Sequence, residues 1–269
     1  MIIIGEKING SIPRVGSAIS QKDTDWIGHL AKMQADAGAD FIDICASVDE
    51  DREAETLAWL IDIVQQAADI PICIDSPSAK ACMLAMPLCK RPGIINSVSM
   101  EGNKIETVFP AIAGTSWGCV ALLCDENGIP DTVERRLEVF ERLMKKAQEY
   151  DIDPSRLYID PLVISLSTDS DALARFCQVS STIKTMYPSI HITSGLSNIS
   201  FGLPARKLVN QAFVVLAMNA GMDSAILDPT NRELIGLIFA TKALLGEDEY
   251  CMEYISAFRN GRIGMSVKA

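Results

Sequence analysis

Acidic and carboxamide side chains recur in this sequence where short apolar segments end. Seven of eight such segments carry or run into one of these side chains, and the residues concerned are Glu6, Asn9, Asp43, Asp75, Asn96, Asp160, Asn198 and Asp228. An ionised carboxylate accepts two parallel N–H bonds, and a carboxamide offers one donor group and one acceptor. These residue types can therefore recognise a ligand through a row of hydrogen bonds.

Such a set favours one class of ligand. It suits a flat neutral heterocycle with several N–H donors along one edge, such as a 2-amino-4-oxo-pterin. A divalent metal ion is the alternative, because Mg²⁺ prefers carboxylate ligands. The carboxamides and the lack of closely spaced carboxylate pairs in the sequence favour the heterocycle, and we expect no bound metal.

Some of these polar residues also have a purely structural interpretation. An Asp or Asn after a strand often forms a turn or caps the next helix, and we interpret the segment Asp228-Pro229-Thr230-Asn231 in this way. Asp43 and Asn96 differ, because each lies inside an apolar segment, where an unpartnered polar group costs roughly 1–3 kcal/mol. We interpret Glu6 as an internal ion-pair partner of Lys7 or of another base at a strand end.

The composition argues against several other chemistries. The 269 residues include only two histidines, His29 and His191, and no two of the eight cysteines form a C-x-x-C pair. Zinc sites and Ser–His triads are therefore unexpected. A net charge of −11 argues against a nucleic-acid-binding surface. With no apolar run near the roughly 18 residues of a membrane span and no signal peptide, we expect a cytoplasmic protein with reduced thiols.

The elements that must position these residues alternate along the whole chain. Eight short apolar segments, each typical of a buried strand, are followed by longer segments with helical periodicity. The predicted strands are 2–4, 41–45, 71–75, 94–98, 119–123, 157–160, 191–194 and 225–228, and the helices are 25–37, 54–68, 79–89, 105–113, 133–150, 172–186, 205–220 and 233–244.

Eight strand–helix units without a linker between them predict an α/β fold, a single (β/α)8 TIM barrel in which residues 1–269 form one domain. A doubly wound open sheet is the alternative, but no G-x-G-x-x-G follows the first strand. Active sites of such barrels lie at the carboxyl ends of the strands. We therefore expect the polar residues to meet at one mouth.

The same segments resemble the motifs of a known family. Gly5-Glu6-Lys7-Ile8-Asn9 resembles the G-E-R-x-N opening of pterin-binding methyltransferases, with Lys7 in place of the usual Arg. Their second, third, fourth, sixth and seventh strands resemble Ala37–Ile44, Ile74-Asp75-Ser76, Ile95-Asn96-Ser97, Asp160-Pro161 and Gly195–Ser200. The ordered set resembles the methyltetrahydrofolate:corrinoid protein methyltransferases and the folate-binding module of cobalamin-dependent methionine synthase.

This resemblance implies an enzyme of one-carbon metabolism, a methyltransferase that moves a methyl group between N5 of tetrahydrofolate and the cobalt of a corrinoid (cobalamin). Tetrahydrofolate or 5-methyltetrahydrofolate is then a substrate, and the sequence leaves the direction of transfer open. The corrinoid is expected on a partner protein and not permanently on this chain, because the sequence lacks a D-x-H-x-x-G segment. The resemblance also implies a homodimer.

The resemblance further implies a role for individual residues. Asp75, Asn96 and Asp160 would hold the pterin edge, Gly195 and Ser197 would shape the pocket, and Arg206 would lie on the folate side. Asn198 would donate a hydrogen bond near N5, supported by a polar network that includes Asp43. A hydrogen bond that strengthens in the transition state lowers the reaction barrier selectively.

Two alternatives stay open. Dihydropteroate synthase shares the barrel fold and a pterin pocket, although its usual N-V-T-P-D-S-F-S-D segment is absent from this sequence. The second alternative is that the chain is a tetrahydrofolate-binding subunit that has no turnover of its own.

Overall fold

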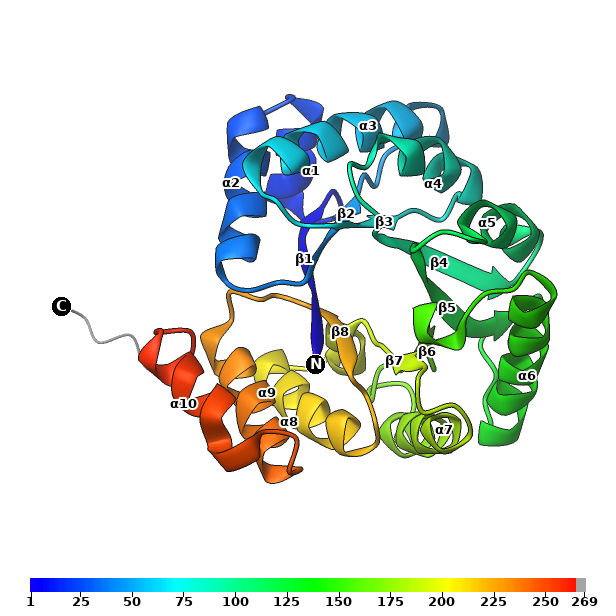
Figure 1. Ribbon diagram of the computed structural model, residues 1–269, viewed down its shortest axis with the longest axis vertical. Helices are drawn as coiled ribbons and strands as arrows, with labels where there is room; N and C mark the ends of the chain where they lie inside the picture. Colours follow the sequence, from blue (N-terminus) through cyan, green and yellow to red (C-terminus); the bar gives the residue numbers. More distant parts are fainter. Residues whose placement is uncertain (265–269) are drawn as a thin grey trace.

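The predicted strands pair in parallel and in sequence order around a barrel, and helices surround them (Figure 1). The computed structural model describes residues 1–264. Its strands are β1 (Ile2–Asn9), β2 (Phe41–Cys45), β3 (Ile72–Asp75), β4 (Ile94–Met100), β5 (Gly118–Asp125), β6 (Leu157–Asp160), β7 (His191–Ile192) and β8 (Ser224–Leu227). The (β/α)8 barrel is thereby confirmed, and the open sheet is excluded because the strands lie in sequence order and the Gly195–Ile226 bridge joins the β7 end of the sheet to β8.

Helices follow every strand. They are α1 (Pro13–Ser20), α2 (Thr24–Asp36), α3 (Glu50–Ala67), α4 (Ala79–Ala85), α5 (Lys104–Ile112), α6 (Val133–Glu149), α7 (Ala172–Met186), α8 (Arg206–Asn219), α9 (Arg232–Leu244) and α10 (Met252–Arg259). Eight of them correspond to the predicted helices, whereas α1 and α10 were not predicted. A short 3₁₀ helix, η3 (Leu196–Ser200), follows β7.

Polar side chains fix where several outer helices begin. Asp23, Ser78 and Thr132 accept a hydrogen bond from the backbone of the first turn of α2, α4 and α6. At α9 this role belongs to Asn231, whose side chain accepts from the Leu234 N–H. Asp228 forms the turn before this cap, because its Oδ1 accepts from the Thr230 N–H and Oγ1 at 2.9 and 2.6 Å. Its Oδ2 pairs with Lys7.

The barrel interior is layered because successive residues of a strand point to opposite faces. The inward residues Ile4, Cys73, Ile94, Val120 and Tyr158 are buried together and form an apolar plug. Two positions further along the same strands, the inward residues are Glu6, Asp75, Asn96, Leu122 and Asp160. A polar layer thus lies directly above the plug, at the carboxyl ends of the strands.

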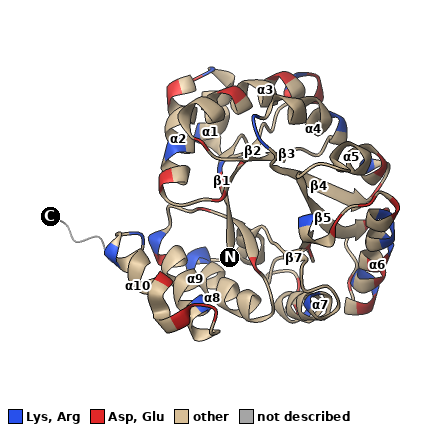
Figure 2. Cartoon of the chain, viewed as in Figure 1, with Lys and Arg blue, Asp and Glu red and all other residues tan. Residues whose placement is uncertain are grey.

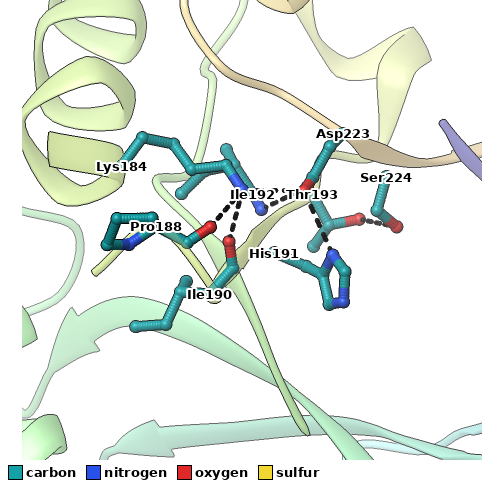
Figure 3. Close-up of polar contacts among 8 residues, drawn as sticks. All are labelled: Lys184, Pro188, Ile190, His191, Ile192, Thr193, Asp223 and Ser224. Carbon is teal, nitrogen blue, oxygen red and sulfur yellow. Dashed lines mark hydrogen bonds and ion pairs between the residues drawn. The ribbon is translucent and has the colours of Figure 1, made fainter. Parts of the chain in front are cut away.

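The barrel closes at a seam between β7 and β8. Figure 3 shows the polar contacts at the amino ends of these two strands. Few backbone bonds cross it, among them Asp223 N–H to the Ile192 carbonyl at 3.2 Å and Ile226 N–H to the Ser194 carbonyl at 3.0 Å. The Asp223 carboxylate strengthens the seam by accepting bonds from Lys184 Nζ, His191 Nδ1 and the Ile192 N–H at 2.7, 3.1 and 2.9 Å.

Lys, Arg, Asp and Glu are interspersed over the outer helices, most densely on α6 (Figure 2). A surface of mixed sign is typical of a protein that stays dispersed in water. Within residues 1–264, no helix is both long and apolar enough to cross a membrane. All eight cysteines are free thiols, and Cys73, Cys82, Cys119 and Cys124 are buried.

We predict that Asp223→Ala lowers the free energy of unfolding by about 2 kcal/mol, because it removes three hydrogen bonds to a partly exposed carboxylate. Burial alone would raise the pKa of Asp223, but hydrogen bonds from His191 and Lys184 outweigh it and lower that pKa. The carboxylate therefore stabilises the fold above its unfolded pKa of about 3.9 and loses this effect as pH falls through the folded pKa.

Urea denaturation of both proteins from pH 7 to pH 3 measures this difference. Asp36→Ala is the matched control, because its carboxylate pairs only with exposed Lys32 on α2 and should cost less than about 0.5 kcal/mol. A loss of stability no larger than in the control would show that the seam does not depend on Asp223.

Candidate functional site

Three of the predicted site residues form a cluster on β2, β3 and β4. Asp75 lies opposite Asn96 in the register of β3 and β4, and Cys73 lies opposite Asp43 in that of β2 and β3. The Asn96 carboxamide Nδ2 donates to Asp43 Oδ1 at 3.3 Å. Asp43 is buried, and this carboxamide is the hydrogen-bond partner that a buried carboxyl requires.

Burial changes the proton affinity of this cluster. Removal from water and the proximity of Asp75 raise the pKa of Asp43, and burial likewise raises the pKa of Asp75. A carboxyl that holds its proton near neutral pH donates an O–H bond in addition to accepting. The cluster can therefore match a ligand edge that mixes donors and acceptors.

Asp160 ends β6 on another side of the barrel. Its Oδ1 accepts from the Leu162 N–H at 2.8 Å, and its carboxylate also accepts from the Gly195 N–H. Burial raises the pKa of Asp160 to about 6, although both backbone bonds and Arg136 oppose the rise. Asp160 is thus largely ionised at pH 7 and presents an acceptor toward the mouth.

Gly195 and Asn198 lie against each other at the end of β7. A Cβ atom at position 195 would lie 3.1 Å from Asn198 Nδ2, which is closer than ordinary van der Waals contact. Glycine therefore leaves room for the Asn198 carboxamide, which is on the exposed side of η3. The bond from the Gly195 N–H to Asp160 connects this segment to β6.

Arg206 and Ser197 also lie at this side of the mouth. Arg206 donates from Nε to Ser200 Oγ at 3.0 Å and from Nη2 to the Ser197 carbonyl at 2.8 Å. These bonds tie the first residue of α8 to η3. Both residues line a cavity of about 350 Å³, together with Glu6, Leu196, Lys207, Asn210, Gln211, Leu227, Asp228, Asn231 and Leu234.

Glu6 is a member of this site whose role the sequence left open. Of the two partners expected for Glu6, Lys7 or another base at a strand end, Lys7 is not the ion-pair partner, because Lys7 Nζ pairs with Asp228 Oδ2 at 2.6 Å. The other nearby base is Arg206, whose charge acts on Glu6. Burial and the nearby Asp228 raise the pKa of Glu6 to about 7, against opposing effects of Lys7 and Arg206. The sequence showed Glu6 as a strand-end carboxyl within the Gly5–Asn9 motif, but it did not show that Glu6 lies in this cavity.

Gln34 on α2 supports this end of β1 and was also missed. The register between β1 and β2 shifts between Gly5 and Ile8, and the Lys7 N–H donates to Gln34 Oε1 at 2.9 Å. A Cβ atom on Gly5 would lie 2.5 Å from the same Oε1. A side chain at position 5 would therefore have to displace the Gln34 carboxamide that binds the Lys7 N–H. The register shift lies at the Glu6–Lys7 segment beside it.

The donor set is thus made of carboxyls and carboxamides. Among residues 1–264, no group of three or more His, Cys, Asp or Glu side chains is arranged to hold a metal ion. The residues that could contact a small ligand fall into two clusters at the mouth, Asp43–Asp75–Asn96 and Asp160–Gly195–Asn198. Glu6 and the Lys7–Asp228 pair lie at the same mouth.

The sequence is similar to those of several known proteins. Residues 15–228 match the family described as pterin binding enzyme. The chain is 51% identical over 266 residues to the methylcorrinoid:tetrahydrofolate methyltransferase of Eubacterium limosum, which covers 98% of each protein. It is 29% and 30% identical to the methionine synthases of Mycobacterium leprae and Mycobacterium tuberculosis, over 84% of this chain but only 20% of theirs.

Solved structures share the fold at much lower identity. Yersinia pestis DHPS with a pterine–sulfa conjugate superposes with a TM-score of 0.63 at 16% identity, over 91% of this chain and 94% of the other. The dihydropteroate synthase of Xanthomonas albilineans gives 0.62 at 17%, over 91% and 92%. This likeness concerns the barrel itself.

We predict that Glu6 titrates near pH 7 and that Asp228→Asn lowers its pKa. The substitution removes the negative charge of Asp228, which disfavours ionisation of Glu6. The positive charge of Lys7 is then no longer neutralised by Asp228, and this also favours the Glu6 carboxylate. ¹³C NMR of side-chain-labelled glutamate measures the titration. Asp223→Ala, at the other end of the barrel, should leave it unchanged. An unaltered Glu6 titration in Asp228→Asn would contradict the assigned electrostatics.

Proposed function

This chain belongs to the family of pterin-binding enzymes, and from that premise we propose that it is a methyltransferase that moves a methyl group between N5 of tetrahydrofolate and the cobalt of a corrinoid. The observation that carries the proposal is the 51% identity, over nearly the full length of both proteins, to a methylcorrinoid:tetrahydrofolate methyltransferase. Residues 1–269 act as a single pterin-binding domain.

The net direction is from the methylcorrinoid to tetrahydrofolate, as the name of that relative supports. Neutral N5 takes the methyl group from cobalt(III), which leaves as cobalt(I), and the N5 proton passes to solvent. The same transition state serves the reverse reaction, so the protein's groups need only to orient N5 and stabilise its developing charge.

The pterin edge is held by Asp75, Asn96 and Asp160. The ionised Asp160 accepts N–H bonds from the heterocycle, and Asn96 supplies a donor and an acceptor beside Asp75. Gly195 and Ser197 shape the pocket wall. Arg206 lies toward the remainder of the folate, which is supported by its place in the cavity beside Ser197.

Asn198 acts on the reacting nitrogen. Its carboxamide oxygen accepts a hydrogen bond from the N5–H, and this bond becomes stronger as N5 gains positive charge, which stabilises the transition state more than the ground state. Asp43, which holds the Asn96 carboxamide, belongs to a supporting polar network through which a water can supply or accept the proton.

The corrinoid comes to the mouth on a partner protein and is not held permanently by this chain. We further propose that the enzyme is a cytoplasmic homodimer. Leu208 and Leu216 on the outer face of α8, which are 67% and 47% exposed, are consistent with a covered surface there. Sedimentation equilibrium tests the dimer, and a monomer at micromolar concentration would refute it.

A corrinoid absorbance assay tests the function. The protein, tetrahydrofolate and methylcobalamin or a methylated corrinoid protein are mixed, and the spectrum should change as methyl transfer proceeds; 5-methyltetrahydrofolate with cobalt(I) corrinoid tests the reverse. Folate binding without any spectral change in either direction would instead indicate a non-catalytic binding subunit. A product formed from p-aminobenzoate would indicate a dihydropteroate synthase.

Asn198→Ala should lower kcat by roughly 10- to 100-fold, which corresponds to a hydrogen bond that contributes about 1–3 kcal/mol in the transition state. Folate affinity, measured by calorimetry, should stay within about twofold because the pterin edge is held elsewhere. Asn103→Ala, on the exposed loop before α5, is the matched control. Lost binding with normal turnover of bound substrate would exclude this role for Asn198.

Asp160→Asn should weaken tetrahydrofolate binding by roughly 10- to 100-fold, because it places a donor against N–H groups. The asparagine can still accept from the Leu162 N–H, so the loop should keep its conformation. Calorimetric titration measures the affinity. Unchanged binding would show that Asp160 only terminates the strand.

A further inference from the structure

Arg136 is a buried cation on the amphipathic helix α6, where the sequence pattern does not distinguish it from the exposed charged residues. Its side chain comes from α6 and is 1% exposed. Nε donates to the Pro130 carbonyl at 2.9 Å, and Nη1 donates to the carbonyls of Pro161 and Leu162 at 2.6 and 3.1 Å. The guanidinium thus joins the loop after β5 to the turn that immediately follows Asp160.

This turn depends on its partners. Leu162 has φ of 62°, a left-handed conformation that costs a branched residue such as leucine on the order of 1 kcal/mol. The Leu162 N–H is bound by Asp160 Oδ1, and the carbonyls of Pro161 and Leu162 are bound by Arg136. The Asp160 carboxylate and the Arg136 guanidinium therefore both hold this turn, one through an N–H and the other through two carbonyls.

We propose that Arg136 is a positioning residue for folate, which holds the Pro161–Leu162 turn so that the Asp160 carboxylate faces the mouth, and which thereby sets folate affinity and not the rate of methyl transfer. This inference rests on the proposed function, because it takes Asp160 as a pterin ligand.

The charges around Arg136 support an electrostatic contribution as well. Arg136 faces Asp160 on β6, Asp169 before α7, Asp131 before α6 and the like charge of Arg175 on α7. The groups that face Asp160 are Arg136 and the N–H groups of Leu162 and Gly195. Because Arg136 lowers the pKa of Asp160 against the effect of burial, its removal must raise that pKa.

Arg136→Met and Arg136→Lys test the proposal, with tetrahydrofolate as the probe. Arg136→Met should raise Kd and KM for tetrahydrofolate about tenfold or more while kcat at saturation stays within about twofold. Arg136→Lys keeps the charge but loses the forked donors, so it should recover part of the affinity. Arg156→Met is the matched control, because Arg156 binds the carbonyls of Ile112 and Trp117 at the amino ends of the strands.

Two further readouts separate positioning from a purely structural role. In the Asp160→Asn background, Arg136→Lys should cause little additional loss of affinity, since the residue through which it acts has been altered. The pH at which folate affinity falls on acidification should be higher for Arg136→Met than for the wild type, because Asp160 must be ionised to accept N–H bonds.

The outcomes are distinct. A folded Arg136→Met protein with wild-type affinity and an unshifted pH profile would overturn the inference while leaving the proposed function intact. So would an affinity loss in Arg136→Lys that adds fully to that of Asp160→Asn. An equal loss of affinity in Arg156→Met would also overturn it. A wild-type protein that binds no tetrahydrofolate would overturn the proposed function and the inference together.

Discussion

The alternation of inward and outward side chains along a strand is the constraint on which this molecule depends. In a closed barrel every inward residue must be accommodated in one narrow space, so each strand contributes to shared layers. Here the plug of Ile4, Cys73, Ile94, Val120 and Tyr158 excludes water from below. The polar residues two positions later pack on this apolar layer, where Glu6, Asp75 and Asn96 are half-buried and Asp160 is buried. Their chemistry follows from that position.

The apolar layer beneath the site raises the pKa values of its carboxyls, because a low dielectric disfavours the charged form. Burial raises the pKa of Glu6 to about 7 and of Asp160 to about 6, and it raises those of Asp43 and Asp75. Carboxyls therefore cover the range of proton affinity that imidazole usually supplies. The scarcity of histidine is consistent with this, because His191 lies at the opposite end, in the seam between β7 and β8.

Local sequence patterns were sufficient for much of the fold. The apolar segments and helical periods predicted every strand and eight outer helices, and the strand ends placed Asp75, Asn96 and Asp160 at one mouth. Helices α1 and α10 were missed because neither belongs to the strand–helix repeat. Glu6, Gln34 and Arg136 could not be assigned, since each acts through contacts between elements distant in sequence, and a buried arginine in a charged helix has the same sequence pattern as a solvated one.

The position of β1 in the ring has a consequence for how the chain reaches this structure. Ile2–Gly5 pair with Ser224–Leu227, more than two hundred residues away in sequence. A chain that emerges amino end first therefore holds β1 with one unsatisfied edge until β8 has been synthesised. Such distant pairing is entropically costly and slow compared with local helix formation. Ring closure is consequently a late event in biogenesis, and the growing sheet is most vulnerable to aggregation before it.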